Sequence, residues 1–253
     1  MKKIYIVRCV GWILSILLLD SCGTGGSGFR ETRDLELPAA SLEAFEIESL
    51  QGDLDITGDS TLDSIKVKAE IVVTNSDEEK AREDIAGGVS LALKKRGNRA
   101  VLTSIFNPGF FLFNVGTEKK IHLDIKSPEG IEIRVTGNGG DVHISDVKSN
   151  VRVEHKSGDT VIERMKGSLD LEDGSGEITI DGLEGSIKCN DLGGDIRISR
   201  VAGGLEITDT SGDVEIKNIN GNVSIHYING NITCEEIMGG VKIIGSGKGN
   251  VRL

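Results

Sequence analysis

The chain has 253 residues, of which 29 are Lys or Arg and 40 are Asp or Glu, so its formal net charge is −11. It contains 34 Gly but 3 Pro, and 4% of its residues are aromatic. The acidic balance disfavours a nucleic-acid-binding protein, because neutralising phosphates requires a basic face. High Gly without a Gly-X-Y period disfavours collagen and indicates many tight turns.

The first residues have the features of a signal peptide. Lys2 and Lys3 precede an uncharged, mostly apolar run over 9–19, which is too short to span a membrane as a helix. The following Leu-Asp-Ser-Cys22 segment resembles the lipobox of bacterial lipoproteins, a family in which the chain is cut before a cysteine that carries diacylglycerol. We therefore expect a signal peptide over 1–21, and a lipidated Cys22 that begins a flexible tether over 22–33. An ordinary secretory signal with a chance cysteine is the alternative.

Residues 34–136 are predicted to form a β-rich cap region with one short helix. Ser76 and Glu79 resemble a capping box, which predicts a helix over about 76–86 that stops at Gly87 and Gly88. The segments with extended patterns are 35–37, 45–47, 52–56, 65–68, 89–94 and 99–106.

Phenylalanine is concentrated in one loop after this helix. Four of the six Phe fall there, namely Phe106, Phe110, Phe111 and Phe113. One interpretation is an apolar plug over the open end of the repeat stack that follows, since stacked repeats need caps. The other is an exposed apolar loop that contacts a membrane or a partner.

Residues 137–253 repeat with a period of nine. Stepping by nine from Gly140 to Gly239, eleven of the twelve positions are Gly. The residues two positions after each of these twelve are apolar except Thr160, and the residues four positions after each of the twelve are all apolar. Each unit therefore reads as a Gly-x-Val-x-Ile strand and a four-residue turn, with its apolar side chains on one face. Since one such strand cannot bury its face alone, the units are expected to stack.

The period of the coil is predicted to be two nonamers rather than one. Seven residues after the Gly, alternate units carry an apolar residue, whereas the other units are mostly polar there. The apolar series is Val147, Met165, Leu183, Val201, Ile219 and Ile237. The outward series Arg152, Asp170, Lys188 and Glu206 alternates in sign at the same spacing, which is favourable if these residues stack. The sequence thus predicts an all-β fold, a parallel β-solenoid (β-helix) with about 18-residue coils of two 9-residue units, plus an N-terminal β-rich cap containing one short helix.

Two cysteines lie in the inward row of the repeat. Cys189 and Cys234 are two and a half coils apart in the sequence, which places them at different heights of the stack and beyond the reach of a disulfide. We expect both to be buried free thiols, and a redox or metal pair is the alternative.

Acidic residues gather at one corner of the coil. Asp173, Glu177, Asp191, Asp195, Asp209 and Asp213 are predicted to stack in two columns along one edge. One interpretation is local, because Asp before Gly forms turns in which its oxygens accept backbone amides. The other is a weak cation-binding site, since hard oxygen ligands suit Ca²⁺. No other metal site and no other cofactor is expected.

The repeats resemble a known family. The segment 120–144 and the unit Ser-Gly-Asp-Val-Glu-Ile over 211–216 resemble the bacterial putative-adhesin domain of unknown function, in which such units build a β-solenoid. The resemblance covers about residues 35–253 and implies the fold and a location in the cell envelope, but no catalytic residues.

We therefore expect a non-catalytic, lipid-anchored protein of the bacterial cell envelope, exposed outside the cytoplasm, that acts as a structural or adhesin-like binding module. Its expected partners are the membrane, through the anchor, and an envelope protein or glycan, but no nucleic acid. An envelope-stress or regulatory accessory protein is the alternative. A polysaccharide-active β-helix enzyme is less favoured, because four-residue turns leave no walls for a cleft.

Overall fold

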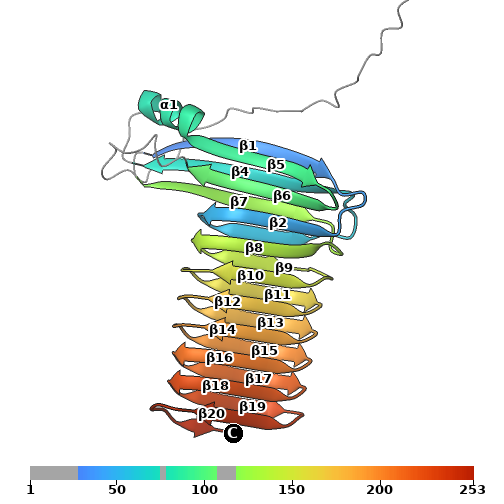
Figure 1. Ribbon diagram of the computed structural model, residues 1–253, viewed down its shortest axis with the longest axis vertical. Helices are drawn as coiled ribbons and strands as arrows, with labels where there is room; N and C mark the ends of the chain where they lie inside the picture. Colours follow the sequence, from blue (N-terminus) through green and yellow to red (C-terminus); the bar gives the residue numbers. More distant parts are fainter. Residues whose placement is uncertain (1–27, 75–77, 107–117) are drawn as a thin grey trace, which may run out of the picture.

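The computed structural model describes residues 28–74, 78–106 and 118–253. Figure 1 shows a column of stacked strands, with longer strands and the helix α1 (Glu78–Gly88) at its amino-terminal end. The all-β solenoid with a short helix in its cap is therefore confirmed. No helix in the described ranges is long and apolar enough to span a membrane.

Two sheets form the walls of the column, and strands alternate between them along the repeats. In the described residues one sheet has 11 strands, in the spatial order β1 (Gly28–Pro38), β4 (Ser64–Thr74), β7 (Lys119–Ser127), β3 (Leu54–Gly58), β9 (Val142–Ser145), β11 (Thr160–Lys166), β13 (Ile178–Glu184), β15 (Ile196–Ala202), β17 (Val214–Asn220), β19 (Ile232–Ile237) and β21 (Val251–Arg252). The other has 10 strands, in the order β20 (Val241–Gly245), β18 (Val223–Asn229), β16 (Leu205–Ser211), β14 (Ile187–Asp191), β12 (Leu169–Asp173), β10 (Val151–His155), β8 (Glu132–Gly139), β2 (Ala44–Gln51), β6 (Arg99–Phe106) and β5 (Val89–Arg96).

The register between neighbouring strands confirms the predicted coil of two nonamers. In the ten-stranded sheet Val151 lies beside Leu169, and Leu169 lies beside Ile187, in parallel. Each residue therefore stacks on the equivalent residue two nonamers away, and the outward series from Arg152 to Glu206 forms one continuous column.

Glycine recurs every nine residues because the backbones of successive coils approach closely at that position. A Cβ built on Gly194, whose φ is +147°, would lie 1.7 Å from the carbonyl oxygen of Gly176. A Cβ on Gly185 would lie 2.1 Å from the carbonyl oxygen of Gly167. Any side chain here would overlap the backbone of the next coil, so the glycine columns are required by packing.

In alternate units the apolar residue seven positions after the glycine faces inward, because the in–out alternation of side chains shifts by one residue just before it. A residue with positive φ, such as Arg164 (51°) or Arg200 (54°), interrupts the pairing in the 11-stranded sheet. The residue after it, Met165 or Val201, is then buried rather than exposed. This left-handed position explains why these strands have a third inward residue, as the two-nonamer pattern predicted.

One continuous core runs through the coils and into the cap. Cys189 and Cys234 are buried in it as free thiols, as expected, and burial raises the pKa of both. Both thiols are therefore protonated and chemically inert near neutral pH.

The strands of the amino-terminal half belong to the same two sheets as the repeats. Each extended segment expected before residue 107 lies in a strand, except that 52–56 enters β3 only at Leu54. The helix α1 lies close to the predicted position but extends through Gly87 and Gly88, where the sequence predicted its end. The strand β3 lies between β7 and β9, and β2 lies between β6 and β8, so both sheets continue from the repeats without a break. Antiparallel pairing of β4 with β7 and of β5 with β6 then ends the parallel stack, and β1 adds antiparallel to β4.

The glycine columns can be tested with two matched substitutions. Gly194→Ala should destabilise the protein by more than about 3 kcal/mol, because the new methyl group meets backbone in a strained conformation. Gly182→Ala should cost about 1 kcal/mol, because φ is +73° but the nearest atom lies 3.7 Å from the new Cβ. Thermal unfolding of both variants measures the difference, and equal shifts in melting temperature would contradict the packing role.

Candidate functional site

A long groove follows the outer face of the ten-stranded sheet. It has a volume of about 1370 Å³ and is lined by residues from β2 and β8 through β20. Because neighbouring strands are about 4.8 Å apart, these eight strands give a groove roughly 34 Å long. The groove therefore runs along the axis of the solenoid, across the strands.

Short residues form one side of this groove. They immediately precede each strand and recur once per coil, so they stack in one column. The column comprises Asn150, Ser168, Ser186, Gly204, Asn222 and Gly240, and all six are exposed. Their small size leaves room beside the next column, which carries the longer side chains from Arg134 to Lys242.

The basic side chains at the amino-terminal end of the groove are held by carboxylates. Arg134 contacts Glu132 at 2.7 Å and Glu46 at 3.2 Å, and Arg152 contacts Asp170 at 3.1 Å. Hydrogen bonds to carboxylates raise the pKa of both guanidinium groups, mainly the bond to Glu132 for Arg134 and the bond to Glu154 for Arg152. A permanently charged guanidinium orients a polar ligand but does not transfer protons near neutral pH.

The acidic corner of the coil contains the two predicted columns, and they differ in burial. Asp195 and Asp213 belong to the exposed column. Their Oδ1 atoms accept the backbone N–H of the residue one coil further on, at 3.0 Å from Asp213 N and 2.9 Å from Asn231 N. Glu177 belongs to the same column and pairs with Arg197. This column therefore links successive coils.

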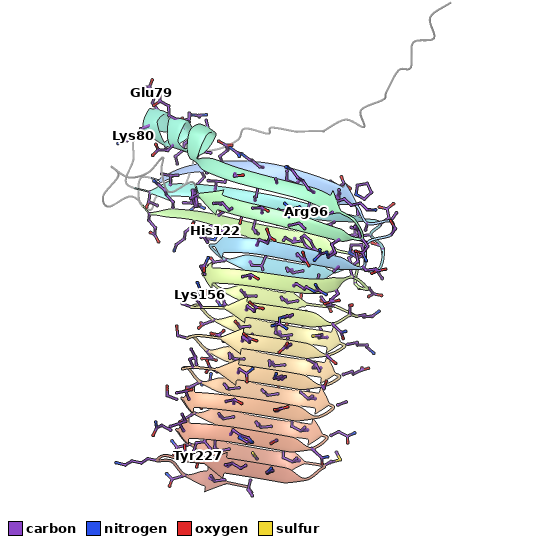
Figure 2. All side chains as sticks on the ribbon, in the orientation of Figure 1. Glu79, Lys80, Arg96, His122, Lys156 and Tyr227 are labelled. Carbon is purple, nitrogen blue, oxygen red and sulfur yellow. The ribbon has the colours of Figure 1, made fainter. Side chains whose placement is uncertain are left out.

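The second column lies inside the solenoid. Asp173, Asp191 and Asp209 are in register on adjacent strands and are 4%, 2% and 1% exposed. His155 precedes them and Tyr227 follows them, at the edge where Figure 2 labels Lys156 and Tyr227. Sequence reasoning placed these carboxylates in a turn, but they continue the inward alternation of their strands. Ile187, Cys189 and Asp191 alternate in this way.

Hydrogen bonds satisfy both oxygens of Asp173 but only one oxygen each of Asp191 and Asp209. Each Oδ1 accepts the backbone N–H two residues further on, as an Asx turn requires: Ser175 for Asp173, Gly193 for Asp191 and Ser211 for Asp209. Oδ2 of Asp173 accepts the hydroxyl of Thr160 at 3.0 Å. The Oδ2 atoms of Asp191 and Asp209 have no hydrogen-bond partner among the residues that the structure describes.

The buried position changes the acidity of this column. Burial, with the neighbouring carboxylates, raises the pKa of Asp191 and of Asp209 to about 6. A protonated carboxyl needs no counter-charge in the interior, so protonation relieves the cost of burial.

Within the described ranges, no group of three or more His, Cys, Asp or Glu side chains is arranged to hold a metal ion. The buried column makes the Asx-turn hydrogen bonds of the local interpretation, whereas the exposed column bonds to the next coil. Weak Ca²⁺ binding stays a prediction. Melting curves with millimolar calcium and with chelator, at matched ionic strength, test it.

The buried column should make stability depend on pH. Because the folded-state pKa values of Asp191 and Asp209 are raised, their contribution to the free energy of unfolding is greatest below pH 4 and is lost as pH rises through about 6. Replacing both aspartates with Asn removes this pH-dependent loss of stability.

We expect Asp191→Asn/Asp209→Asn and wild type to melt closest together at pH 3.5, where most of these aspartates are protonated in the folded and the unfolded protein, and the variant to melt higher than wild type at pH 8. Melting curves at the two pH values in chelator measure this. A variant that melts lower than wild type at pH 8 would show that the charged carboxylates stabilise the fold.

The other predicted site residues fall mainly outside the described residues. Cys22 lies there, as do Phe110, Phe111 and Phe113. Phe106, at the end of β6, is buried in the core with 9% exposure. The choice between plug and exposed loop stays a prediction for the other three.

Sequence spacing did not reveal two histidine–carboxylate pairs on the outer face of the 11-stranded sheet. His122 Nδ1 lies 3.0 Å from Asp53 Oδ2, and His143 Nδ1 lies 3.2 Å from Asp55 Oδ2. They border a hollow of about 480 Å³. Only the insertion of β3 between β7 and β9 brings these residues together, and local sequence patterns do not specify that pairing.

Comparison with known proteins concerns the whole fold. No curated protein matches the chain. The family model Toastrack DUF4097 matches residues 20–233. The chain belongs to this family.

Several solved structures are similar to this chain at low sequence identity. A putative adhesin from Bacteroides fragilis NCTC 9343 is 18% identical, with a TM-score of 0.59 over 88% of this chain and 96% of that chain. A putative adhesin from Parabacteroides distasonis ATCC 8503 is 15% identical, with a TM-score of 0.47 over 90% and 98%. A putative lipid-binding protein from the same strain is also 15% identical, with a TM-score of 0.44 over 89% and 98%. At these identities the likeness concerns the fold alone.

Proposed function

We propose that this Toastrack protein is a non-catalytic, adhesin-like binding module of the bacterial cell envelope and that its ligand lies in the long groove. The groove itself carries the proposal, because it crosses eight strands and presents an exposed short residue, Asn, Ser or Gly, on each coil from β10 to β20. Its basic side chains include Arg134 and Arg152, whose permanently charged guanidinium groups can orient a ligand.

The rigid sheet and packed core beneath the groove suit a binding role. Its strands are paired in register along the whole solenoid, and their inward side chains belong to one packed core. Ligand binding therefore requires little ordering of the protein, which lowers the entropic cost of association.

We further propose that a lipid on Cys22 holds this module at a membrane. The charged start, the short apolar run and the glycine-rich tether support this anchor. Two or three acyl chains would give stable attachment, whereas one chain binds only marginally.

The anchor is tested by Cys22→Ser in cells. The variant should lose lipid modification and leave the membrane fraction, which metabolic labelling with a fatty acid and fractionation measure. Unchanged membrane retention of the variant would contradict the anchor, without affecting the proposal for the groove.

The groove is tested by filling it without altering charge. Ser186→Gln/Gly204→Gln places two longer side chains on adjacent coils of the groove, and a Cβ at Gly204 has no atom closer than 3.7 Å. Ser175→Gln/Gly193→Gln is the matched control, because this Ser and Gly also lie one coil apart but in the opposite turn, outside the groove.

Both variants should melt close to wild type. The groove variant should lose at least about tenfold in binding to a cell-envelope fraction, while the control should bind as wild type does. Equal binding by the two variants would contradict the groove as the ligand surface.

A further inference from the structure

We infer that the ligand of the groove is a neutral glycan that lies along the solenoid axis. This inference rests on the proposed function and adds the chemical class of the ligand. Four properties of the groove support it: its length, its paired strands, its charge and its lining.

The length of the groove favours a polymer. A hollow that crosses the strands from β2 to β20 is too long for a compact metabolite to fill. The short residues repeat once per coil, so a chain of similar units would meet a similar set of groups at each step. Sugar residues in an extended glycan have a rise close to the spacing of the coils.

The pairing of the strands disfavours an added peptide strand. From β2 to β18 each strand of the ten-stranded sheet has a neighbour on both sides. Strand addition requires an unpaired sheet edge, because the peptide binds through backbone hydrogen bonds. A ligand in this groove must therefore be recognised by side chains.

The charge of the groove disfavours a polyanion. Six carboxylates and four basic groups line it, which leaves it at −2. Arg134 and Arg152 already contact carboxylates. In the register of the sheet, Lys188 lies beside Glu206. An anionic polymer would gain few free cations and would meet carboxylates on β2, β8, β10, β12 and β16.

The lining disfavours a lipid chain. The aliphatic residues from Ile47 to Val223 that border the groove are at most 3% exposed, because their side chains point into the core. None of the described residues that line the groove is aromatic. Polar and charged side chains interrupt the apolar surface of the groove at every coil, so an acyl chain would meet no continuous apolar lining.

The short residues suit hydroxyl and acetamido groups. Oδ1 of Asn150 accepts the N–H of Ser168, and Oδ1 of Asn222 accepts the N–H of Gly240. These bonds orient the two side-chain amides, whose NH₂ groups make no hydrogen bond within the described part of the chain. Both can donate to sugar oxygens, and the hydroxyls of Ser168 and Ser186 donate or accept.

Without aromatic stacking, each sugar should contribute little, so affinity should grow with the number of coils engaged. Short oligosaccharides should bind weakly, and binding should strengthen until the glycan spans the groove. This dependence on length distinguishes a groove of repeated sites from a single sugar pocket.

The experiment uses the full mature chain and purified polysaccharides. The neutral probes are glucans, mannans and N-acetylglucosamine oligomers of increasing length, and the anionic probe is polygalacturonate. Phosphatidylcholine vesicles test a lipid. Affinity is measured by calorimetry for wild type, for Ser186→Gln/Gly204→Gln and for the control Ser175→Gln/Gly193→Gln.

We expect at least one neutral glycan to bind wild type and the control, more tightly as it lengthens, and to bind the groove variant at least about tenfold more weakly. Binding of only polygalacturonate or vesicles, lost in the groove variant, would overturn the neutral class but keep the groove as the binding surface. Neutral-glycan binding that the groove variant retains would overturn the groove itself. Binding of none of these probes would overturn the glycan assignment.

Discussion

Close contact between the backbones of successive coils is the constraint on which this structure depends. At each glycine column a Cβ would lie about 2 Å from a carbonyl oxygen of the neighbouring coil, as at Gly176 and Gly158 (2.0 Å). This contact fixes the rise of one coil and keeps the strands in parallel register, offset by one full coil. As a result, residues one coil apart in sequence become neighbours in space, and a sequence pattern becomes a column of like side chains.

The groove and the buried Asp column both follow from this stacking of residues one coil apart. The exposed column of short residues gives a straight groove that every coil extends. The column of Asp173, Asp191 and Asp209 places carboxylates in an interior that is mostly apolar. Their Asx turns hold the corner of each coil, so the turn geometry requires the Asp while the interior disfavours its charge. The raised pKa values of Asp191 and Asp209 are the consequence of this conflict.

The period of the sequence predicted the solenoid, its register and its third inward residue, because each depends on contacts that repeat. It did not predict the burial of the Asp column, although Ile187, Cys189 and Asp191 continue a period of two that signals it. The short column from Asn150 to Gly240 is also visible at the spacing of one coil, but its depth depends on how neighbouring side chains fold over it. The placement of β2 and β3 within the stack depends on long-range pairing that no local pattern specifies.

The central claim is that ligands lie in the groove of the ten-stranded sheet, and lysine labelling tests it most directly. Lys188 and Lys242 line the groove, whereas Lys217 is exposed on β17 of the other sheet. The full chain is acetylated with and without a cell-envelope fraction from its own bacterium, and each lysine is quantified by mass spectrometry. The account predicts that labelling of Lys188 and Lys242 falls while that of Lys217 stays constant. Unchanged labelling of Lys188 and Lys242, with protection of Lys217, would contradict it.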